Sequence, residues 1–388
     1  MKKTRLGTFC WFFILVSASL MLSTGCSALR ADQETTGQRS RDSFDKDWRF
    51  KLYDVGTDDS AWELQKSGYD DSAWRVLNLP HDWAVEQGFD INLPNNTGRL
   101  PSPGLGWYRK HFKIDAADQG KRIFVDFDGA MSHSTIWLNG HEVGGWPYGY
   151  TSFRVELTDS LNYGGDNVLA VRLDNPELSS RWYPGGGIYR HTWLVKTAPV
   201  HVTHWGTYIT TPPSTPDTAR IDIQTEIQNQ SAQDATVSVE QAVFKRNGSK
   251  PIASKTLDSL TVSAGATHDC STMLSVDDPI MWDIEKPYLY TVRTTITQAG
   301  EVVDVYETPF GIRTIEFDAD KGFLLNGKHV RLNGVCMHHD LGPLGAAMNR
   351  RAVERQVEIL KEMGCNAIRT SHNPPTPELL GLSQEVFH

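Results

Sequence analysis

The sequence has few cysteines, no excess of positive charge and only a single long apolar run. Five of the 388 residues are cysteine, and Cys270, Cys336 and Cys365 are those outside the N-terminal segment. A sparse and odd set predicts neither a disulfide framework nor a zinc site, so we expect buried structural thiols. The net charge of −9 at pH 7 argues against a surface that follows nucleic-acid phosphates.

The apolar run lies at the N-terminus and is shorter than the roughly 20 residues that span a membrane. Basic residues precede apolar residues 9–22, and "LSTGC" then places Cys26 after small residues. This pattern resembles a bacterial lipoprotein signal, residues 1–26, in which Cys26 becomes the acylated N-terminus. An ordinary secretory signal cut near Ala28 is the alternative. We therefore expect export to the periplasm or the cell surface, on a lipid anchor in a bacterial membrane.

Short alternating stretches predict two β-sandwiches after this segment. Residues 27–43 are polar and aperiodic, which is typical of a tether. In 44–198, "STIWLNGHEV" indicates two strands joined by a tight Asn139-Gly140 turn. Residues 199–315 alternate in the same way, which predicts a second, immunoglobulin-like sandwich. The twelve Trp and twelve Tyr suit both sandwich cores and sugar stacking.

The pattern changes in residues 316–388. "HVRLNGVC" and "NAIRT" indicate strands, and "NRRAVERQVEILKEMG" between them indicates an amphipathic helix. We expect Asn349 to cap this helix and Gly364 to end it. The predicted apolar stripe consists of Val353, Val357, Leu360 and Met363. A strand, a helix and a strand this close together predict a parallel pair covered by helices.

Polar side chains follow both of these strands. The first strand is followed by His338, His339 and Asp340, and the second carries or is followed by Arg369, Ser371, His372 and Asn373. Ligands of parallel α/β folds are held at the carboxyl ends of the strands. The histidines lack a recognisable metal-ligand spacing, so we predict a ligand site without a metal.

These stretches resemble glycoside hydrolase family 2, the family of β-galactosidases and β-glucuronidases. "GVCMHHDLGPLG" and "NAIRTSHNPPTPELL" are similar to the start of its catalytic barrel. "LPHDW", "YGYTSFRVELT" and "SRWYPGGGIYR" are similar to its sugar-binding sandwich, and "WDIEKPYLYTV" and "FGIRTIEF" to its middle domain. The resemblance covers about residues 44–382. It implies a multidomain, mainly β protein: a jelly-roll-like sandwich, an immunoglobulin-like sandwich and the first βαβ unit of an incomplete (β/α)8 barrel.

The resemblance also implies substrate-binding residues. Arg369 matches an arginine that orients a catalytic carboxylate, and His372 matches a histidine that bonds the sugar. The other implied pocket residues are His338, His339 and Asp340 on the barrel side and Arg181 and Trp182 on a sandwich loop. The implied substrate is a β-galactoside in an oligo- or polysaccharide, and we expect no cofactor or metal within this chain. His81, Asp82 and Trp83 suit a buried turn network.

The family pattern breaks down over the last eight residues. Gly381, Gln384 and Phe387 depart from it before His388, which predicts a frameshift, an early stop or a gene-model break. Retaining glycosidases need two carboxylates about 5–5.5 Å apart, and the resemblance puts both catalytic glutamates on later barrel strands. We therefore expect no catalytic residue in this chain, no activity of the polypeptide alone, and poor packing of residues 316–388.

Two other hypotheses remain open. The chain could be a non-catalytic carbohydrate-binding surface lipoprotein made of the two sandwiches, although the extra βαβ segment counts against it. It could also be a structural or adhesive surface lipoprotein, which a stable fold without glycan binding would favour. The exact sugar, its linkage and the oligomeric state stay open.

Overall fold

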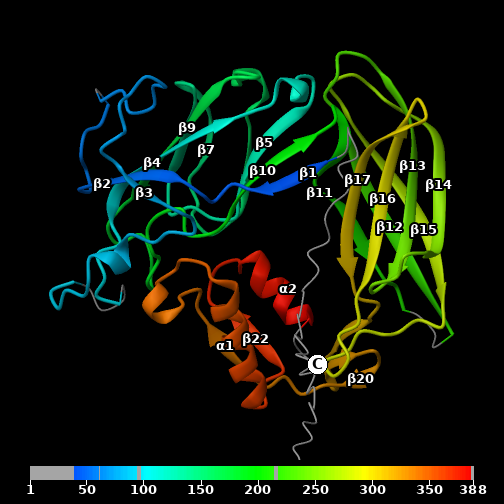
Figure 1. Cartoon of the computed structure of the whole chain (residues 1–388). Helices are drawn as coiled ribbons and strands as arrows, with labels where there is room; N and C mark the ends of the chain where they lie inside the picture. Colours follow the sequence, from blue (N-terminus) through cyan, green and yellow to red (C-terminus); the bar gives the residue numbers. More distant parts are fainter. Residues whose placement is uncertain (1–38, 61, 94–97, 214–216, 386–388) are drawn as a thin grey trace, which may run out of the picture. The chain divides into compact units, whose positions relative to one another are not determined.

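Two antiparallel sheets form the N-terminal sandwich (Figure 1). The structure is a computed structural model that describes residues 39–60, 62–93, 98–213 and 217–385, so Cys26 and the predicted signal lie outside the described residues. One sheet has the order β1 (Ser40–Ser43), β10 (Thr192–Thr197), β5 (Arg122–Phe127), β8 (Phe153–Glu156). The other has the order β3 (Arg75–Leu77), β2 (Trp48–Tyr53), β4 (Gly104–Lys113), β9 (Asp166–Asn175), β6 (Ser134–Leu138), β7 (His141–Trp146).

The inner faces of these sheets bury a core rich in aromatic side chains. Trp48, Trp83, Tyr108 and Phe127 are fully buried there. Most of the abundant aromatic residues near the N-terminus therefore serve packing, and only those left in solvent are available to a ligand. The strand β1 extends the first sheet by pairing with β10, so residues 40–43 belong to the sandwich although the sequence placed them in the tether.

The predicted Asn139-Gly140 turn joins β6 to β7. Both residues have a positive φ, 52° and 88°, as a two-residue hairpin turn requires. Both the nitrogen and the oxygen of the Asn139 side-chain amide make hydrogen bonds. Its Nδ2 donates to Ser160 O at 2.8 Å and to Asn167 Oδ1 at 2.9 Å, and its Oδ1 accepts from Val168 N at 3.0 Å.

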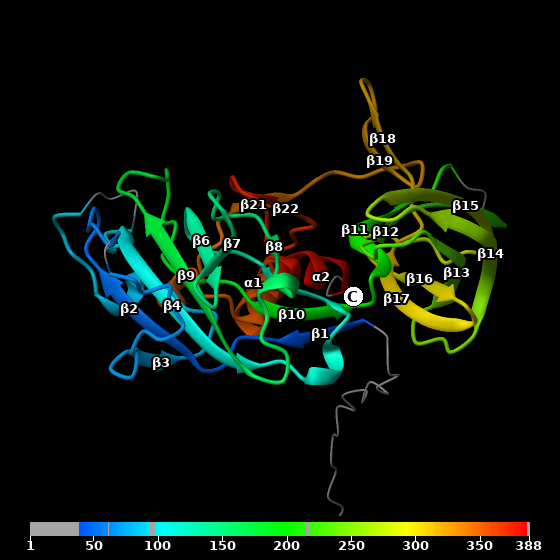
Figure 2. The same ribbon diagram turned by 90° about the horizontal axis from the view of Figure 1, so that it is seen from above.

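The second sandwich is built from two further antiparallel sheets (Figure 2). One has the order β11 (Val200–Thr210), β12 (Thr218–Asn229), β15 (Thr267–Asp277). The other has the order β14 (Pro251–Val262), β13 (Ala235–Lys245), β16 (Tyr290–Gln298), β17 (Glu301–Phe310). Alternating residues of β12 and β16, such as Ile221, Ile223 and Val292, are fully buried, as the sequence pattern predicts.

The remaining described residues form a small sheet and a βαβ unit. The small sheet consists of β18 (Ile315–Asp318), β19 (Gly322–Leu325) and β20 (Lys328–His329). The βαβ unit consists of β21 (Gly334–Met337), α1 (Arg350–Glu362) and β22 (Ala367–Thr370), followed by α2 (Pro377–Glu385). Short 3-10 turns lie at η1 (Ala84–Glu86), η3 (Ala116–Asp118), η4 (Thr158–Ser160) and η5 (Gly342–Leu344).

The strands β21 and β22 pair in parallel, as predicted. One face of the pair, with Met337 and Ile368, packs against α1 and α2. The Asn349 side chain accepts from Ala352 N at 3.0 Å and caps α1, and Gly364 beyond its end has a φ of 81°. The single predicted strand "HVRLNGVC" is divided between two strands: His329 ends β20 and Gly334 begins β21, and residues 330–333 belong to neither.

Two expectations about burial are wrong in this segment. Met363 is 66% exposed, because it lies beyond the last turn of α1, where the apolar stripe no longer meets the strands. Cys270 is buried as expected, but Cys336 is exposed. Alternate residues of a strand point to opposite faces, so Cys336 lies on the face of the sheet that the helices do not cover. No helix within the described ranges is long and apolar enough to cross a membrane.

Candidate functional site

The strand ends of the βαβ unit bring most of the predicted site residues together. The His338 and His372 rings lie 5.9 Å apart at 89°, and the Trp182 ring lies 4.9 Å from that of His338. The Trp182 Nε1–H donates to Asp340 Oδ1 at 2.9 Å. We call Trp182, His338, Asp340, Arg369 and His372 the strand-end cluster.

Arg369 sets the hydrogen-bonding state of His372. Its Nη2 donates to His372 Nδ1 at 3.2 Å. A guanidinium can only donate, so Nδ1 is the acceptor nitrogen and a neutral His372 carries its proton on Nε2. Both side chains are exposed. The Nε2–H of His372 is therefore a donor that points away from its arginine partner and is available to a ligand oxygen.

Arg369 also makes contacts on the exposed face of the sheet formed by β21 and β22. Its partner in the parallel register is Cys336, and its Nη1 lies 3.5 Å from Cys336 Sγ and 3.0 Å from Ser371 Oγ. The hydrogen bond from Arg369, followed by that from Ser371, lowers the pKa of the Cys336 thiol. The open face of β21 and β22 is therefore electropositive and carries hydrogen-bond donors.

His339 lies in a different environment from His338. Its ring contacts Tyr150 at 5.3 Å and Tyr189 at 5.7 Å, and its Nε2–H donates to Pro184 O at 3.2 Å. Burial lowers the pKa of His339 to about 4, and the positive charge of Arg190 adds to the effect. His339 is therefore neutral at ordinary pH and bonded to the sandwich. Arg181, the remaining predicted residue, is exposed and makes no hydrogen bond or ion pair within the described residues.

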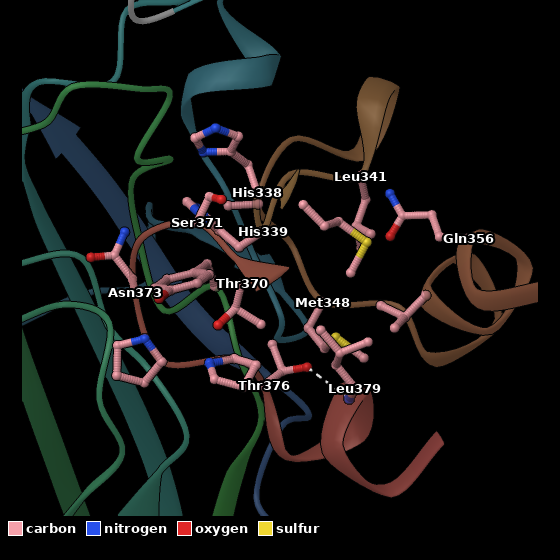
Figure 3. Close-up of a pocket in the computed structure, with 16 residues that line it drawn as sticks. His338, His339, Leu341, Met348, Gln356, Thr370, Ser371, Asn373, Thr376 and Leu379 are labelled. Carbon is pink, nitrogen blue, oxygen red and sulfur yellow. Dashed lines mark hydrogen bonds between the residues drawn. The ribbon is translucent and has the colours of Figure 1, made fainter. Parts of the chain in front are cut away.

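A small cavity lies beside His338 of the strand-end cluster (Figure 3). Its volume is about 30 Å³, and its lining includes Leu341, Met348 and Leu379. A cavity of this volume holds only a few water molecules, so it is too small for a sugar ring. His338 projects away from Thr376 and Leu379 (Figure 3). A sugar ring therefore has no room in the cavity beside His338, whereas Arg369 and His372 are open to solvent on the exposed side of the cluster.

Asp82 fixes the loop that follows Asp340. Its carboxylate accepts from Ala346 N at 2.7 Å, from Ala84 N and Gly186 N at 3.0 Å each, and from the Tyr183 hydroxyl. Burial raises the pKa of Asp82, although its four donors act in the opposite direction. The "LPHDW" motif is thus a buried network, in agreement with the structural interpretation of these residues.

Glycines allow the loop with Trp182 to pack closely. A Cβ added at Gly186 would overlap the indole of Trp83, and one added at Gly345 would overlap the Asp82 carboxylate. Gly345 also has a φ of 60°, which disfavours any side chain. The "YPGGG" stretch can therefore lie directly on the sandwich core, and this holds Trp182 beside His338.

The sequence analysis missed two residues that contact the segment after β22. Arg190 is fully buried, and its guanidinium donates to Pro374 O at 3.0 Å and to Pro375 O at 3.5 Å. The Tyr148 hydroxyl donates to Asn373 Oδ1 at 2.8 Å. Both residues lie in motifs that resemble the family, "YGYTSFRVELT" and "SRWYPGGGIYR", and that resemblance was the one available signal.

The mainly β modular fold and the polar strand ends define a class of carbohydrate-active proteins, and comparisons with known proteins agree. A model of "Glycosyl hydrolases family 2" matches residues 200–313, its "TIM barrel domain" matches 318–386, and its "galactose-binding domain-like" model matches 106–183. The chain belongs to glycosyl hydrolase family 2.

Relatives of the chain include proteins with two different names. The chain is 46% identical to "Beta-galactosidase BoGH2A" of Bacteroides ovatus over 90% of its own length and 40% of that protein's. It is 36% identical to a "Putative beta-glucuronidase" of Formosa agariphila over 91% of its own length and 33% of that protein's. The chain thus spans about 40% of the length of the first of these relatives.

Solved structures show the same fold. A family 2 member from Bacteroides cellulosilyticus is 41% identical with a TM-score of 0.81, over 89% of this chain and 46% of that one. A beta-glycosidase from Bacteroides vulgatus is 34% identical with a TM-score of 0.79, over 89% of this chain and 43% of that one. The predicted sequence of domain types, two sandwiches and a partial barrel, is confirmed.

Proposed function

We propose that this chain is the sugar-recognising part of a glycosidase that removes terminal β-D-galactosyl groups in carbohydrate breakdown. The observation that supports this most directly is the strand-end cluster. It combines an aromatic ring, two histidines and an arginine on the exposed side of β21 and β22. The 46% identity to a protein named as a β-galactosidase favours galactosides among the substrates of the family.

The cluster offers the contacts that a sugar ring requires. Sugars present hydroxyl groups at their edges and C–H groups on their faces. In this proposal the Nε2–H of His372 donates to a hydroxyl, Arg369 orients His372 and any nearby carboxylate, and the Trp182 ring stacks on a C–H face. His338 lies between these groups and contacts both rings. His339 and Arg181 act on the periphery of the site.

Hydrolysis with retention requires an acid/base and a nucleophilic carboxylate about 5–5.5 Å apart. Asp340 is the acidic member of the strand-end cluster, and it accepts a hydrogen bond from Trp182. Glu354 and Glu358 are bonded to Arg351 on the surface of α1, and Glu378 lies beside His191. We therefore expect the polypeptide of residues 27–388 to bind sugar without hydrolysing it.

A chromogenic assay tests this expectation. Purified residues 27–388 are incubated with p-nitrophenyl β-D-galactoside, beside a version extended by the coding sequence downstream. Turnover by the extended version alone supports the proposal. Turnover by residues 27–388 that disappears in His372→Ala would show that the described part is itself catalytic, and no turnover by either version would count against the galactosidase activity.

A β-glucuronidase is the second candidate. One relative with 36% identity is named a putative β-glucuronidase and one with 31% identity a β-glucuronidase. The exposed cation of Arg369 could pair with the carboxylate of a glucuronide. The same assay with p-nitrophenyl β-D-glucuronide separates the two. A preference of the wild type for the glucuronide would favour this second candidate, and Arg369→Gln should then reduce turnover of the glucuronide more than turnover of the galactoside.

We also propose that the protein is exported and acylated at Cys26. The basic start, the apolar residues 9–22 and the small residues before Cys26 support this proposal. Radiolabelled palmitate should enter the wild type and not Cys26→Ala. Equal labelling of both would exclude acylation at this residue.

A further inference from the structure

Two aromatic side chains of the sandwich contact the two strand ends in the same way. Tyr148, in the loop between β7 and β8, donates its hydroxyl to Asn373 Oδ1 at 2.8 Å, one residue after His372. Trp182 donates its Nε1–H to Asp340 Oδ1 at 2.9 Å, two residues after His338. Each ring is thus fixed by its polar end to the polar segment that follows one of the two parallel strands.

Both rings are partly exposed to solvent, although each also packs against a neighbouring ring, Trp182 against His338 and Tyr148 against Tyr150. Tyr148 is 45% exposed and Trp182 is 42% exposed. Tyr148 packs against Tyr150 at 5.5 Å, and Tyr150 in turn contacts His339. Because hydrogen bonds and neighbouring rings already hold both side chains, a ligand that stacks on them loses little side-chain entropy. Rings with one apolar face and a bonded polar end are well suited to bind amphipathic molecules.

Asn373, which follows His372 in the chain, adds a hydrogen-bond donor beside Tyr148. Its Oδ1 is occupied by Tyr148, whereas its Nδ2–H₂ makes no hydrogen bond within the described residues. Figure 3 shows Asn373 on the opposite side of the small cavity from Gln356. Its amide nitrogen is therefore available to a ligand oxygen on the sandwich side of the site.

The space around the cluster sets the direction in which a second sugar ring can extend. The cavity beside His338 has a volume of about 30 Å³ and a lining of both apolar and polar side chains, so it has no room for a second sugar ring. The exposed side of the cluster is the other direction for a second ring, and Tyr148 and Trp182 are the sandwich side chains bonded to the segments that follow the two strands.

We propose that Tyr148, with Asn373, forms a second saccharide subsite that binds the sugar on the leaving-group side of the scissile bond. Tyr148 stacks on the face of this ring, Asn373 donates to one of its oxygens, and Trp182 bounds the subsite on the other side. The inference rests on the proposed function, because it assumes that the strand-end cluster binds the terminal galactosyl group. It makes Tyr148 a determinant of the preferred aglycone.

Binding of a monosaccharide and a disaccharide to residues 27–388 tests the subsite. Isothermal titration with methyl β-D-galactoside and with lactose gives the two dissociation constants. The wild type should bind lactose more tightly by about 2- to 12-fold, the range for one aromatic contact. Tyr148→Ala should remove this preference and leave the affinity for the methyl galactoside unchanged. Tyr148→Phe, which keeps the ring, should retain most of the preference.

The control is Tyr208→Ala, because Tyr208 is 64% exposed on β11 of the second sandwich. It should leave both affinities unchanged. Equal affinities for the two ligands in the wild type, or an equal loss for both in Tyr148→Ala, would overturn the subsite while the galactoside proposal stands. Absence of binding by either ligand would overturn the sugar-recognising function and the subsite together.

Discussion

Asp82 joins three segments of the chain through one buried carboxylate. The segments are the turn at Ala84, the glycine loop at Gly186 and the loop after η5 at Ala346. Each gives a donor, and Tyr183 adds a fourth. A buried acceptor with this many donors is costly to replace, because each unpaired donor then loses its partner away from water.

Asp82→Asn should therefore lower the free energy of unfolding by about 1–3 kcal/mol. The amide places N–H groups where the carboxylate accepted, so at least one donor is left unpaired. Urea unfolding followed by circular dichroism measures the loss, and hydrogen exchange should accelerate at residues 345–348. Asp166→Asn is the matched control, because that side chain is 82% exposed and its nearest cation is 3.5 Å away. Equal stability of the two variants would contradict the assigned role of Asp82.

At the level of single residues, part of the candidate site was predictable from the sequence. His338, Arg369 and His372 follow or end two strands, and the parallel register alone brings them together. Tyr148 could not be found in this way, because its contact with Asn373 joins residues 225 positions apart. The exposure of Cys336 was missed for a related reason: a strand pattern shows two faces but not which of them the helices cover.

The elements of the βαβ unit are held to the sandwich by their loops. Met348 N donates to Tyr189 O at 2.8 Å, Arg190 donates to Pro374 O at 3.0 Å, and His339 donates to Pro184 O at 3.2 Å. The packing of residues 316–388, which we expected to be poor, therefore differs between the two parts of this range. The strands β18 to β20 expose Phe317 by 77%, whereas the segment from β21 to α2 has partners in the sandwich.

Limited trypsin digestion should cut first at Lys321, Lys328 and Arg331, which are all exposed. The cut chain should still elute as one species in native size-exclusion chromatography, because the sandwich contacts hold the C-terminal fragment. It should separate into two fragments in urea. Release of that fragment under native conditions would show that the loops do not anchor it. A variant with all three residues changed to Gln should resist the first cut.

The cap of α1 gives a second prediction for this element. Asn349 accepts from Ala352 N at 3.0 Å, so Asn349→Ala should destabilise the helix by about 1 kcal/mol. Hydrogen exchange of a peptide from residues 350–362 should then be about fivefold faster, since every 1.4 kcal/mol corresponds to tenfold. Glu362→Ala at the other end of α1 should cause little change. Unchanged exchange in Asn349→Ala would mean that packing alone sets the start of the helix.

The existence and order of the elements were more predictable than their ends. The parallel pair, its helix and the Asn349 cap were all expected from the sequence. The irregular middle of "HVRLNGVC" and the exposure of Met363 were not, because tertiary contacts decide where pairing stops and where an apolar stripe loses its partner. The break in the apolar stripe coincides with the end of α1 at Glu362.

Several histidines make the stability of the whole molecule sensitive to acid. Burial lowers the pKa values of His81, His201, His204 and His339 to about 4 each. The unfolded chain binds protons near pH 6.5, so the stabilising effect is complete above that value and is lost as the pH falls from about 6.5 toward 4. His191 has the opposite sign: burial lowers its pKa, but Asp45 and Glu378 outweigh this and raise it.

The free energy of unfolding should therefore fall by several kcal/mol between pH 7 and pH 4.5, at about 1–3 kcal/mol for each buried histidine. Urea titrations at intervals of half a pH unit measure this. In His201→Gln the curve should be flatter, because that position no longer takes up a proton on unfolding. His141→Gln, at an exposed position in β7, should leave the slope unchanged. Parallel curves for the wild type and His201→Gln would exclude this source of acid sensitivity.

The hydrogen bonds of Asn139 also bear on how the purified protein ages in storage. Asparagine followed by glycine is prone to deamidation, because the glycine nitrogen can attack the side-chain carbon and close a succinimide ring. In Asn139-Gly140 three hydrogen bonds hold the side-chain amide, and all must break before the ring can close. Asn326 is held in the same way, by Thr314 and Trp282. Two exposed asparagines that precede glycine, Asn247 at the turn between β13 and β14 and Asn333 before β21, have no side-chain hydrogen bond within the described residues. Chemical ageing should therefore begin at Asn247 and Asn333, where peptide mapping would detect isoaspartate first, while the β6–β7 turn stays intact.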